Sequence, residues 1–239
     1  MGSDSYRSLA FDRELFGFEV VLLQSPSLGT TELLELLDEL RARGVRLAYW
    51  PAAPEPRNDA AAERAGGFLA DERTTYVCDL AGLGEIERPT EVEEYASNET
   101  TPELEELAIA SAELSRFAVD PRVPRRVFET LYRRWLVNSL EKRLAEVTLV
   151  VRDGDRIVGM ATVGEKDGRS DIGLIAVDAH CRGRSLGTKL VRAAQHWGRT
   201  QHRTLAQVVT QGRNEVAARL YARCRYRVER VEHYYHFWL

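Results

Sequence analysis

One stretch restricts the fold of this chain more than any other, the run LIAVDAHCRGRSLGTKL at residues 174–190. A β-branched strand leads into a loop with Arg182, Gly183 and Arg184, and the loop leads directly into a helix. Such a junction directs free backbone N–H groups at one point, which the positive end of the helix dipole also faces. With two arginines beside it, the junction predicts an anion site that suits a pyrophosphate.

Two common phosphate-binding loops do not fit this junction. The Gly-Lys-Ser/Thr ending of a Walker A loop is absent, and the GxGxxG fingerprint of a Rossmann fold does not match. An ordinary solvated turn between a strand and a helix stays open at this level, because a Gly-Arg turn alone is a weak signal. The choice therefore depends on the residues around the loop.

A longer pattern surrounds the loop. Arg182 and Gly187 fit the motif Arg/Gln-x-x-Gly-x-Gly/Ala, with Ser185 in place of its first glycine, and serine constrains the turn more than glycine does. Downstream, Asn214-x-x-Ala217-x-x-Leu220-Tyr221 precedes Arg225-Tyr226, where a second motif has Gly-Phe. In both segments the chain resembles the GNAT acetyltransferases, whose acetyl-CoA site contains these motifs.

The resemblance implies an α/β GNAT fold with a central mixed, mostly antiparallel sheet flanked by helices, and acetyl-CoA as acyl donor beside the strand at 171–177. It implies that the pyrophosphate lies on the amides of 182–187 and that Tyr221 is the catalytic acid that protonates the departing thiolate. Tyr221 follows Asn214 by seven residues, so the two share a helix face, roughly 10 Å apart. The implied cofactor-binding residues are Leu174, Ile175, Ala176, Val177, Arg182, Gly183, Arg184, Ser185, Leu186, Gly187, Thr188, Asn214 and Ala217.

The apolar periodicity agrees with that fold. From residue 102 the predicted order is α-α-β-β-β-α-β-α-β-β, with hairpin turns at 153–155 and 167–168. Two separate strands, 227–232 and 234–239, are predicted to end the chain. The N-terminal part is predicted as β-α-β-α-β, with a strand at 45–50 that ends at a proline-rich stretch.

Residues 81–101 are polar and acidic, which predicts a linker. We therefore predict a βαβαβ N-terminal region at 1–90, a degenerate GNAT-like domain, and a catalytic GNAT domain at 91–239. Leu28-Gly-Thr resembles Leu186-Gly-Thr, and the helices that begin at Asn58 and Asn214 are also similar. Either the N-terminal part is a degenerate copy of the C-terminal one, or two βαβ units simply look alike.

The stretch before the first of these similar segments differs in its chemistry. Gln24-Ser-Pro-Ser27 stands where Arg182-Gly-Arg-Ser185 precedes the second segment, and it lacks the glycine and the arginines. The N-terminal part is therefore predicted to bind no phosphate.

A narrower resemblance covers nearly the whole chain. The segments that carry it are Leu15-Phe16-Gly17-Phe18, Ser115-Arg116-Phe117 with Asp120-Pro121, Trp135-Leu136-x-Asn138-Ser139, Val209-Thr210-Gln211 and Tyr235-His236-Phe237-Trp238-Leu239. In these segments the chain looks like the dTDP-fucosamine acetyltransferases, which acetylate the 4-amino group of a dTDP-linked 4-amino-4,6-dideoxygalactose.

An acceptor of this kind is anionic, and Arg116, with the arginines at 122, 125 and 126, could receive its diphosphate. Phe117 or Trp135 could stack on its base, and Gln211 is a further candidate for substrate binding. A surface salt bridge is an equal alternative for Arg116, and core packing is the stronger one for Trp135.

Other acceptors and roles stay open. A protein or peptide amine is one alternative, and a non-catalytic acyl-CoA-binding module is another. The general base is unassigned: Glu165 and Asp171 lie near the strand that flanks the thioester, but solvation at a hairpin turn explains them equally well. His233 and His236 fall on opposite faces of a strand and are predicted to be structural.

Composition excludes several classes of protein. With a net charge of −4, 44% hydrophobic and 29% charged residues, the chain is typical of a soluble globular protein without a basic field for nucleic acid. The cysteines, at 78, 181 and 224, form no CxxC pair, so neither a zinc site nor a disulfide framework is predicted. No signal peptide and no apolar run near 20 residues is found. We expect a cytoplasmic enzyme with a small-molecule substrate, no metal and no membrane partner, and a homodimer stays open.

Overall fold

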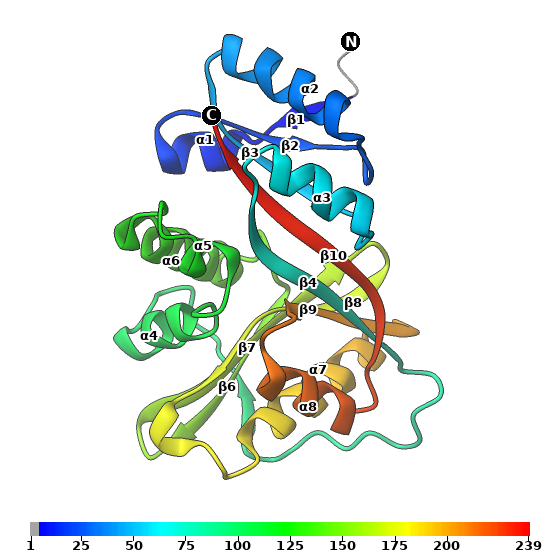
Figure 1. Ribbon diagram of the computed structural model, residues 1–239. Helices are drawn as coiled ribbons and strands as arrows, with labels where there is room; N and C mark the ends of the chain where they lie inside the picture. The colour runs from blue at the N-terminus through cyan, green and yellow to red at the C-terminus, as the bar shows by residue number, and fades with distance from the viewer. Residues whose placement is uncertain (1–4) are drawn as a thin grey trace.

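The computed structural model describes residues 5–239 and contains one ten-stranded mixed sheet, in the order β1-β2-β3-β10-β4-β9-β8-β7-β6-β5 (Figure 1). The strands are β1 (Tyr6–Ser8), β2 (Glu19–Leu23), β3 (Val45–Ala52), β4 (Phe68–Asp79), β5 (Val92–Glu94), β6 (Val147–Asp153), β7 (Arg156–Lys166), β8 (Arg169–Val177), β9 (Leu205–Gln211) and β10 (Arg227–Trp238). The helices are α1 (Ala10–Phe16), α2 (Thr30–Ala42), α3 (Pro56–Arg64), α4 (Pro102–Ala110), α5 (Arg116–Val119), α6 (Arg125–Leu140), α7 (Leu186–Thr200) and α8 (Glu215–Arg223), with a short 3₁₀ turn at Ala179–Cys181. This is the GNAT fold, as predicted.

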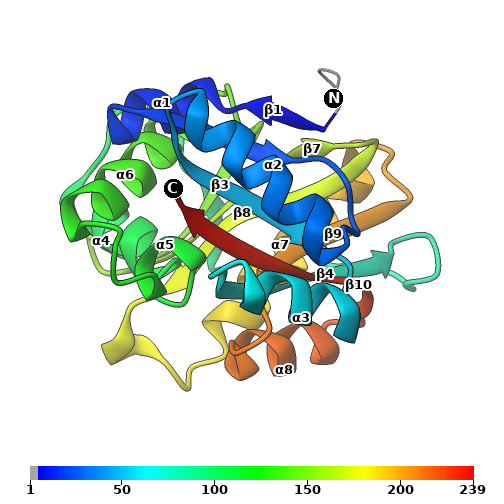
Figure 2. The same cartoon turned by 45° about the horizontal axis from the view of Figure 1, so that its top comes forward.

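The sheet has a symmetric order about its centre. The run β2-α2-β3-α3-β4 has the same succession as β8-α7-β9-α8-β10, and β2 and β3 pair in parallel as β8 and β9 do. The last strand of each run lies next to the other run, because β10 pairs with β3 and β4 pairs with β9 (Figure 2). An internal repeat predicts such an order. The division into domains near residue 90 stays a prediction.

Helices cover both faces of the sheet. Neighbouring residues of β2 point to opposite faces of the sheet. Val20 packs in the core that α4 and α6 cover, and Val21 packs in the core that α2 covers. On the C-terminal half of the sheet, Val191 of α7 and Tyr221 of α8 form the core of the face opposite α4 and α6. The helices α4, α5 and α6 therefore lie together on one side of the sheet, where Figure 1 shows them in green.

The C-terminal segment corrects one prediction. It forms one strand, β10, and not the two predicted strands, since His233 stays paired with Ala52 of β3 and with Glu72 of β4. Irregularities in the pairing with β4 fall between Tyr234 and Tyr235 and near Val228. These bulges absorb the local breaks in alternation within one continuous strand.

Several short elements were also missed or misplaced. The predicted linker at 81–101 contains β5, which forms by pairing with β6, and the short helix α5 was not predicted. The strand β3 continues through Pro51. Its pairing with β2 ends at Tyr49, so no hydrogen bond to β2 requires the N–H group that proline lacks. The elements β1 and α1 carry no strong periodicity and were not predicted.

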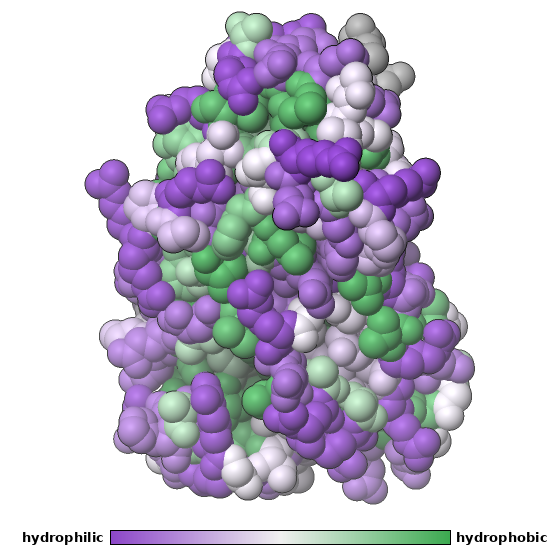
Figure 3. All heavy atoms as spheres, in the orientation of Figure 1, coloured by the Kyte–Doolittle hydropathy of each residue, from purple (hydrophilic) through white to green (hydrophobic). Residues whose placement is uncertain are grey.

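No helix in residues 5–239 is both long and apolar enough to cross a bilayer. Over the same residues, no group of three or more His, Cys, Asp or Glu side chains is placed to hold a metal ion. Hydrophilic residues cover much of the face seen in Figure 3, and hydrophobic ones reach the surface between them in separate patches, near the top, in the middle and toward the lower left.

Candidate active site

The strands β8 and β9 open a gap in the sheet. They pair in parallel only from Ser170 with Ala206 to Ile172 with Val208, although β8 continues to Val177. On its other edge β8 stays paired with β7 as far as Val177. The two strands therefore diverge at their carboxyl ends and leave a V between them.

Backbone donors of β8 face this V. The N–H of Leu174 donates to Oγ1 of Thr162 on β7 at 2.9 Å, and the N–H of Asp178 donates to the carbonyl of Val158 at 2.8 Å. Because successive N–H groups of a strand point to opposite edges, those of Ile175 and Val177 point away from β7, into the V.

The N-terminus of α7 lies at the mouth of the V. Its N-cap, Ser185, has a φ of 60° and makes no side-chain cap, so the first N–H groups of the helix have no side-chain acceptor. Gly183 has a φ of 80°, and a Cβ on Gly187 would lie 3.3 Å from Leu220 of α8. The turn thus brings bare backbone to a cavity, and a phosphate group fits such a cradle.

The two arginines of the loop differ in their position. Arg182 lines the cavity, whereas Nη1 of Arg184 lies 2.6 Å from Oδ2 of Asp153, and its side chain is outside the cavity lining. Of the remaining predicted cofactor residues, all line the cavity, namely Leu174, Ile175, Ala176, Val177, Gly183, Ser185, Leu186, Gly187, Thr188, Asn214 and Ala217. That these residues bind acetyl-CoA stays a prediction.

The helix α8 carries the predicted acid. Asn214 is its N-cap and accepts a hydrogen bond from the N–H of Ala217 at 3.1 Å, so its side chain is committed to the helix end. Tyr221 lines the same cavity, is 2% exposed, and packs beside the rings of Tyr76 and Tyr226. Within residues 5–239 its hydroxyl has no hydrogen-bond partner, and burial raises its pKa above the ordinary value of a phenol.

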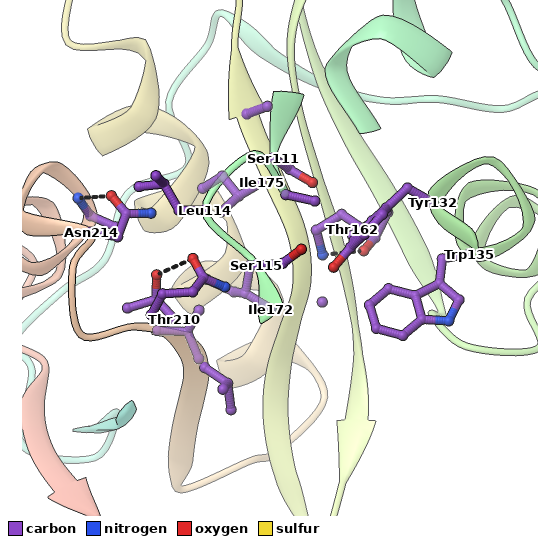
Figure 4. Close-up of a pocket in the computed structure, with 18 of the residues that line it drawn as sticks. Ser111, Leu114, Ser115, Tyr132, Trp135, Thr162, Ile172, Ile175, Thr210 and Asn214 are labelled. Carbon is purple, nitrogen blue, oxygen red and sulfur yellow. Dashed lines mark hydrogen bonds between the residues drawn. The ribbon is translucent and has the colours of Figure 1, made fainter. Parts of the chain in front are cut away.

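The cavity measures about 1530 Å³ and reaches both faces of the sheet. Beyond the V it is lined by α5 and α6 and by residues of the N-terminal part, including Leu9, Asp12 and Pro51. Figure 4 shows Tyr132 and Trp135 of α6 on one side of β8, and Asn214 and Thr210 on the other. Trp135 thus lines the cavity, where core packing was the favoured expectation.

Arg116 lies at the far end of the cavity, between aromatic rings. Its guanidinium carbon is 3.9 Å from the ring centres of both Tyr49 and Phe117, and 4.8 Å from that of Tyr234. Within residues 5–239 it forms no ion pair, so the surface salt bridge considered for it is absent. Phe117 and Gln211 also line the cavity.

A buried pair holds Arg116 in place. Nη1 of Arg116 lies 3.1 Å from Nε2 of His236, whose Nδ1 lies 2.8 Å from Oδ2 of Asp120. Burial lowers the pKa of His236 to about 4, so the ring is neutral at pH 7. Since Asp120 only accepts and Arg116 only donates, the ring proton lies on Nδ1.

Sequence reasoning missed two carboxyl groups in this cavity, the buried Asp71 and the partly buried Asp12. Burial raises the pKa of Asp71 to about 7, against the opposing effect of Arg213 and Arg116. An acidic residue directly after the apolar residues 68–70 was the signal that could have indicated Asp71, although Glu72 and Asp79 lie in the same strand. For Asp12, in an element that was not predicted, no comparable signal exists.

The diverging strands, the uncapped helix N-terminus and the buried tyrosine lie around one cavity, the arrangement that the resemblance to GNAT acetyltransferases predicts for an acyl-donor site. Residues 112–226, slightly less than half of the chain, match the Acetyltransferase (GNAT) family.

Known proteins add to this assignment. Over 133 residues, 56% of this chain and 46% of the other, the chain is 29% identical to the spore coat polysaccharide biosynthesis protein SpsD of Bacillus subtilis (strain 168). The match thus spans less than half of that protein. A GCN5-related N-acetyltransferase from Sphaerobacter thermophilus superposes with a TM-score of 0.63 at 16% identity, over 98% of this chain and 76% of its own. A tandem GNAT protein from the clavulanic acid biosynthesis pathway superposes with a TM-score of 0.56 at 14% sequence identity, over 92% of this chain and 75% of its own. At such identities the likeness concerns the fold.

Proposed function

We propose that this chain transfers an acetyl group from acetyl-CoA to the amino group of a nucleotide-linked aminodeoxy sugar, a dTDP-linked 4-amino sugar in the first instance. The observation that carries the proposal is the single cavity that joins the V between β8 and β9 to the buried guanidinium of Arg116. An acceptor with an amine and a diphosphate matches both ends of such a cavity.

Two further observations support a sugar nucleotide. The aromatic residues Phe117, Tyr132 and Trp135 line the acceptor side of the cavity and offer faces for a base or a sugar ring. The printed name of the relative SpsD places that protein in polysaccharide biosynthesis. An anion site at one end of a cavity also fits a small anionic acceptor better than an extended peptide, which needs a continuous groove.

In this proposal the residues of the V stabilise the reacting group. Bound acetyl-CoA supplies the acetyl group as a thioester. The N–H of Ile175 donates to the carbonyl oxygen of the thioester as negative charge develops there, and the N–H of Val177 binds the adjoining arm. Tyr221 donates its phenolic proton to the sulfur as the C–S bond breaks. Burial raises the pKa of Tyr221, so the phenol keeps its proton until negative charge develops on the sulfur.

The test is a coupled measurement of free thiol with acetyl-CoA and a panel of amines. The panel holds dTDP-linked 3-amino and 4-amino sugars, the free amino sugars and a lysine peptide. Turnover with the nucleotide-linked amines that exceeds turnover with the free sugars by about 10²-fold or more is expected, since Arg116 contacts only the former. Equal turnover of the free sugars, or a preference for the peptide, would contradict the proposal.

A further inference from the structure

Asp71 on β4 is a buried carboxyl group with an oxygen that has no partner. It is 5% exposed and lines the cavity, and within residues 5–239 its Oδ1 makes no hydrogen bond. An unpaired buried polar atom of this kind lowers stability. Its presence in a cavity wall points to a functional role for the carboxyl group.

Each of the other carboxyl groups of the cavity has at least one oxygen engaged by a protein donor. Asp171 accepts from Nε2 of Gln207 at 2.9 Å, and Asp12 accepts from the hydroxyl of Tyr49 at 3.1 Å. Glu165 is held by the N–H of Gly168 and by Arg203 at the hairpin turn, and Glu113 and Glu232 pair with arginines. The carboxyl of Asp71 differs from these because no protein donor within residues 5–239 meets its buried Oδ1.

The pairing of the strands places Asp71 beyond the open end of the V. Ile172 pairs with Val208, so Ile175 on β8 stands three residues further along, as Gln211 does on β9. Gln211 pairs with Arg73 on β4, and Asp71 lies two residues beyond Arg73. Asp71 is thus about 7 Å further along the sheet than Ile175 and two strand spacings, roughly 10 Å, to its side, and both residues line the same cavity.

Asp71 lies on the acceptor side of the sheet. It pairs with Tyr234 on β10, whose ring contacts the guanidinium of Arg116, and its charge also acts on Tyr132 of α6. The charged groups that act on Asp71 are Arg213, Arg116 and Arg73, which favour the carboxylate, and Glu72, which disfavours it. An amine held between Arg116 and the V therefore passes Asp71.

We propose that Asp71 is the general base of the transfer and accepts a proton, through water in the cavity, from the ammonium group of the acceptor. This inference rests on the proposed acetylation of an amine. The ammonium loses one proton to Asp71, and its lone pair forms the C–N bond to the carbonyl carbon. As the C–S bond breaks, Tyr221 protonates the sulfur, and the second nitrogen proton returns through water to Tyr221. Asp71 then releases its proton to solvent, so one proton is set free per turnover.

The titration of Asp71 suits this role. Burial raises its pKa to about 7, near the pH at which the enzyme would operate, where a base combines a useful ionised fraction with sufficient basicity. Wild-type kcat/KM should then rise with pH through an inflection near 7.

The experiment compares pH profiles of kcat/KM for the wild type, Asp71→Asn, Asp71→Glu and Asp171→Asn with the best amine of the panel. In Asp71→Asn, kcat/KM should fall by about 10²-fold or more at pH 7 and the inflection should vanish. The loss should shrink at high pH, where the amine is already unprotonated. Asp71→Glu should keep the inflection, and Asp171→Asn should keep it as well.

Two further measurements keep the outcomes distinct. In Asp71→Asn, acetyl-CoA affinity from calorimetry should stay near the wild-type value and the melting temperature should not fall below that of the wild type, which separates a lost base from a lost fold. An unchanged profile in Asp71→Asn, or loss of the inflection in Asp171→Asn instead, overturns the assignment. If the best amine is not a sugar nucleotide, the proposed acceptor fails while the test of Asp71 stands. If no amine is acetylated, both fail.

Discussion

At the scale of single residues, Tyr221 is the side chain on which the chemistry depends most directly. Its hydroxyl faces the cavity without a partner among residues 5–239, and the ring is fixed between Tyr76 and Tyr226. Tyr221→Phe keeps the ring and removes the proton. Turnover should fall by about 10²-fold or more with acetyl-CoA affinity nearly level, measured where chemistry limits the rate. Wild-type turnover in this variant would leave Tyr221 a packing residue.

Two residues at turn positions hold a conformation that glycine prefers. Ser185 and Arg225 stand where the GNAT motifs have glycine, and their φ angles are 60° and 67°. The left-handed conformation costs an L-residue about 1–2 kcal/mol, and part of this is offset by the greater freedom of glycine in the unfolded chain. Ser185→Gly and Arg225→Gly should each stabilise the protein by about 1 kcal/mol, a rise of roughly 2–4 °C in Tm.

Gly183→Ala is the matched control for these two variants. Its φ is also positive, at 80°, and an added Cβ meets no atom within 4 Å, so only backbone strain changes. This variant should lower Tm. A lower Tm in both glycine variants would show that the serine and arginine side chains contribute more than the strain costs.

The pH dependence of stability tests the raised pKa of Asp71 without any substrate. Its pKa is about 7 in the folded chain and about 3.9 when unfolded, so the folded state binds more protons between these values. Wild-type stability contributed by this group is therefore present at pH 4 and lost as pH rises to 7. Relative to the wild type, Asp71→Asn should gain up to about 4 kcal/mol between pH 4 and pH 8 in urea unfolding. A difference that stays constant with pH would contradict the raised pKa.

At the scale of elements, the junction of β8 and α7 and its counterpart before α2 make a natural comparison. Gly187 and Gly29 occupy matching places in the two similar segments, but a Cβ would meet Leu220 only at Gly187. Gly187→Val should therefore push α7 from α8 and weaken CoA binding in calorimetry by tenfold or more, a loss of about 1.4 kcal/mol. Gly29→Val should leave CoA affinity unchanged, with one CoA bound per chain.

The segment before α2 is filled by its own side chains. Oδ1 of Asn58 accepts from the hydroxyl of Ser27, and Nδ2 of Asn58 donates to the carbonyls of Ala53 and Pro26, while Nε1 of Trp50 donates to the carbonyl of Ser25. Asn58 is fully buried. The predicted absence of a phosphate site in the N-terminal part thus has a structural basis that calorimetry can test. A second CoA per chain would refute it.

The same elements show how much of the fold and of the candidate site can be predicted from the sequence. The β8–α7 junction and the Asn214 cap were predictable because local rules decide them: a strand, a positive-φ turn and a capping residue lie within one short stretch. The acceptor side was not predictable in detail. Asp71, Asp12 and Arg116 meet only through the pairing of β4, β9 and β10 and the docking of α1 and α5, and no local pattern encodes such a meeting.

At the scale of the whole molecule, β10 joins the two halves of the sheet. It pairs with β3 from His233 to Trp238 and with β4 over most of its length. Neither half keeps a complete sheet without it, so the protein should unfold in one cooperative transition. Urea unfolding followed at Trp50 and at Trp197, each in a variant with the other tryptophans replaced by phenylalanine, should give coincident curves. Separate transitions would show that the halves are independent domains.

The exchange of β4 and β10 between the two runs also bears on how such a chain arises. A polypeptide with one run alone would lack the strand that closes its own sheet, and its last strand would project toward a partner. Two copies could complete each other's sheets by exchanging those strands, as in a domain-swapped dimer. A duplication that fused the two copies would make this exchange of strands intramolecular. One copy would then be free to lose its cofactor loop and to become the wall against which the acceptor is held.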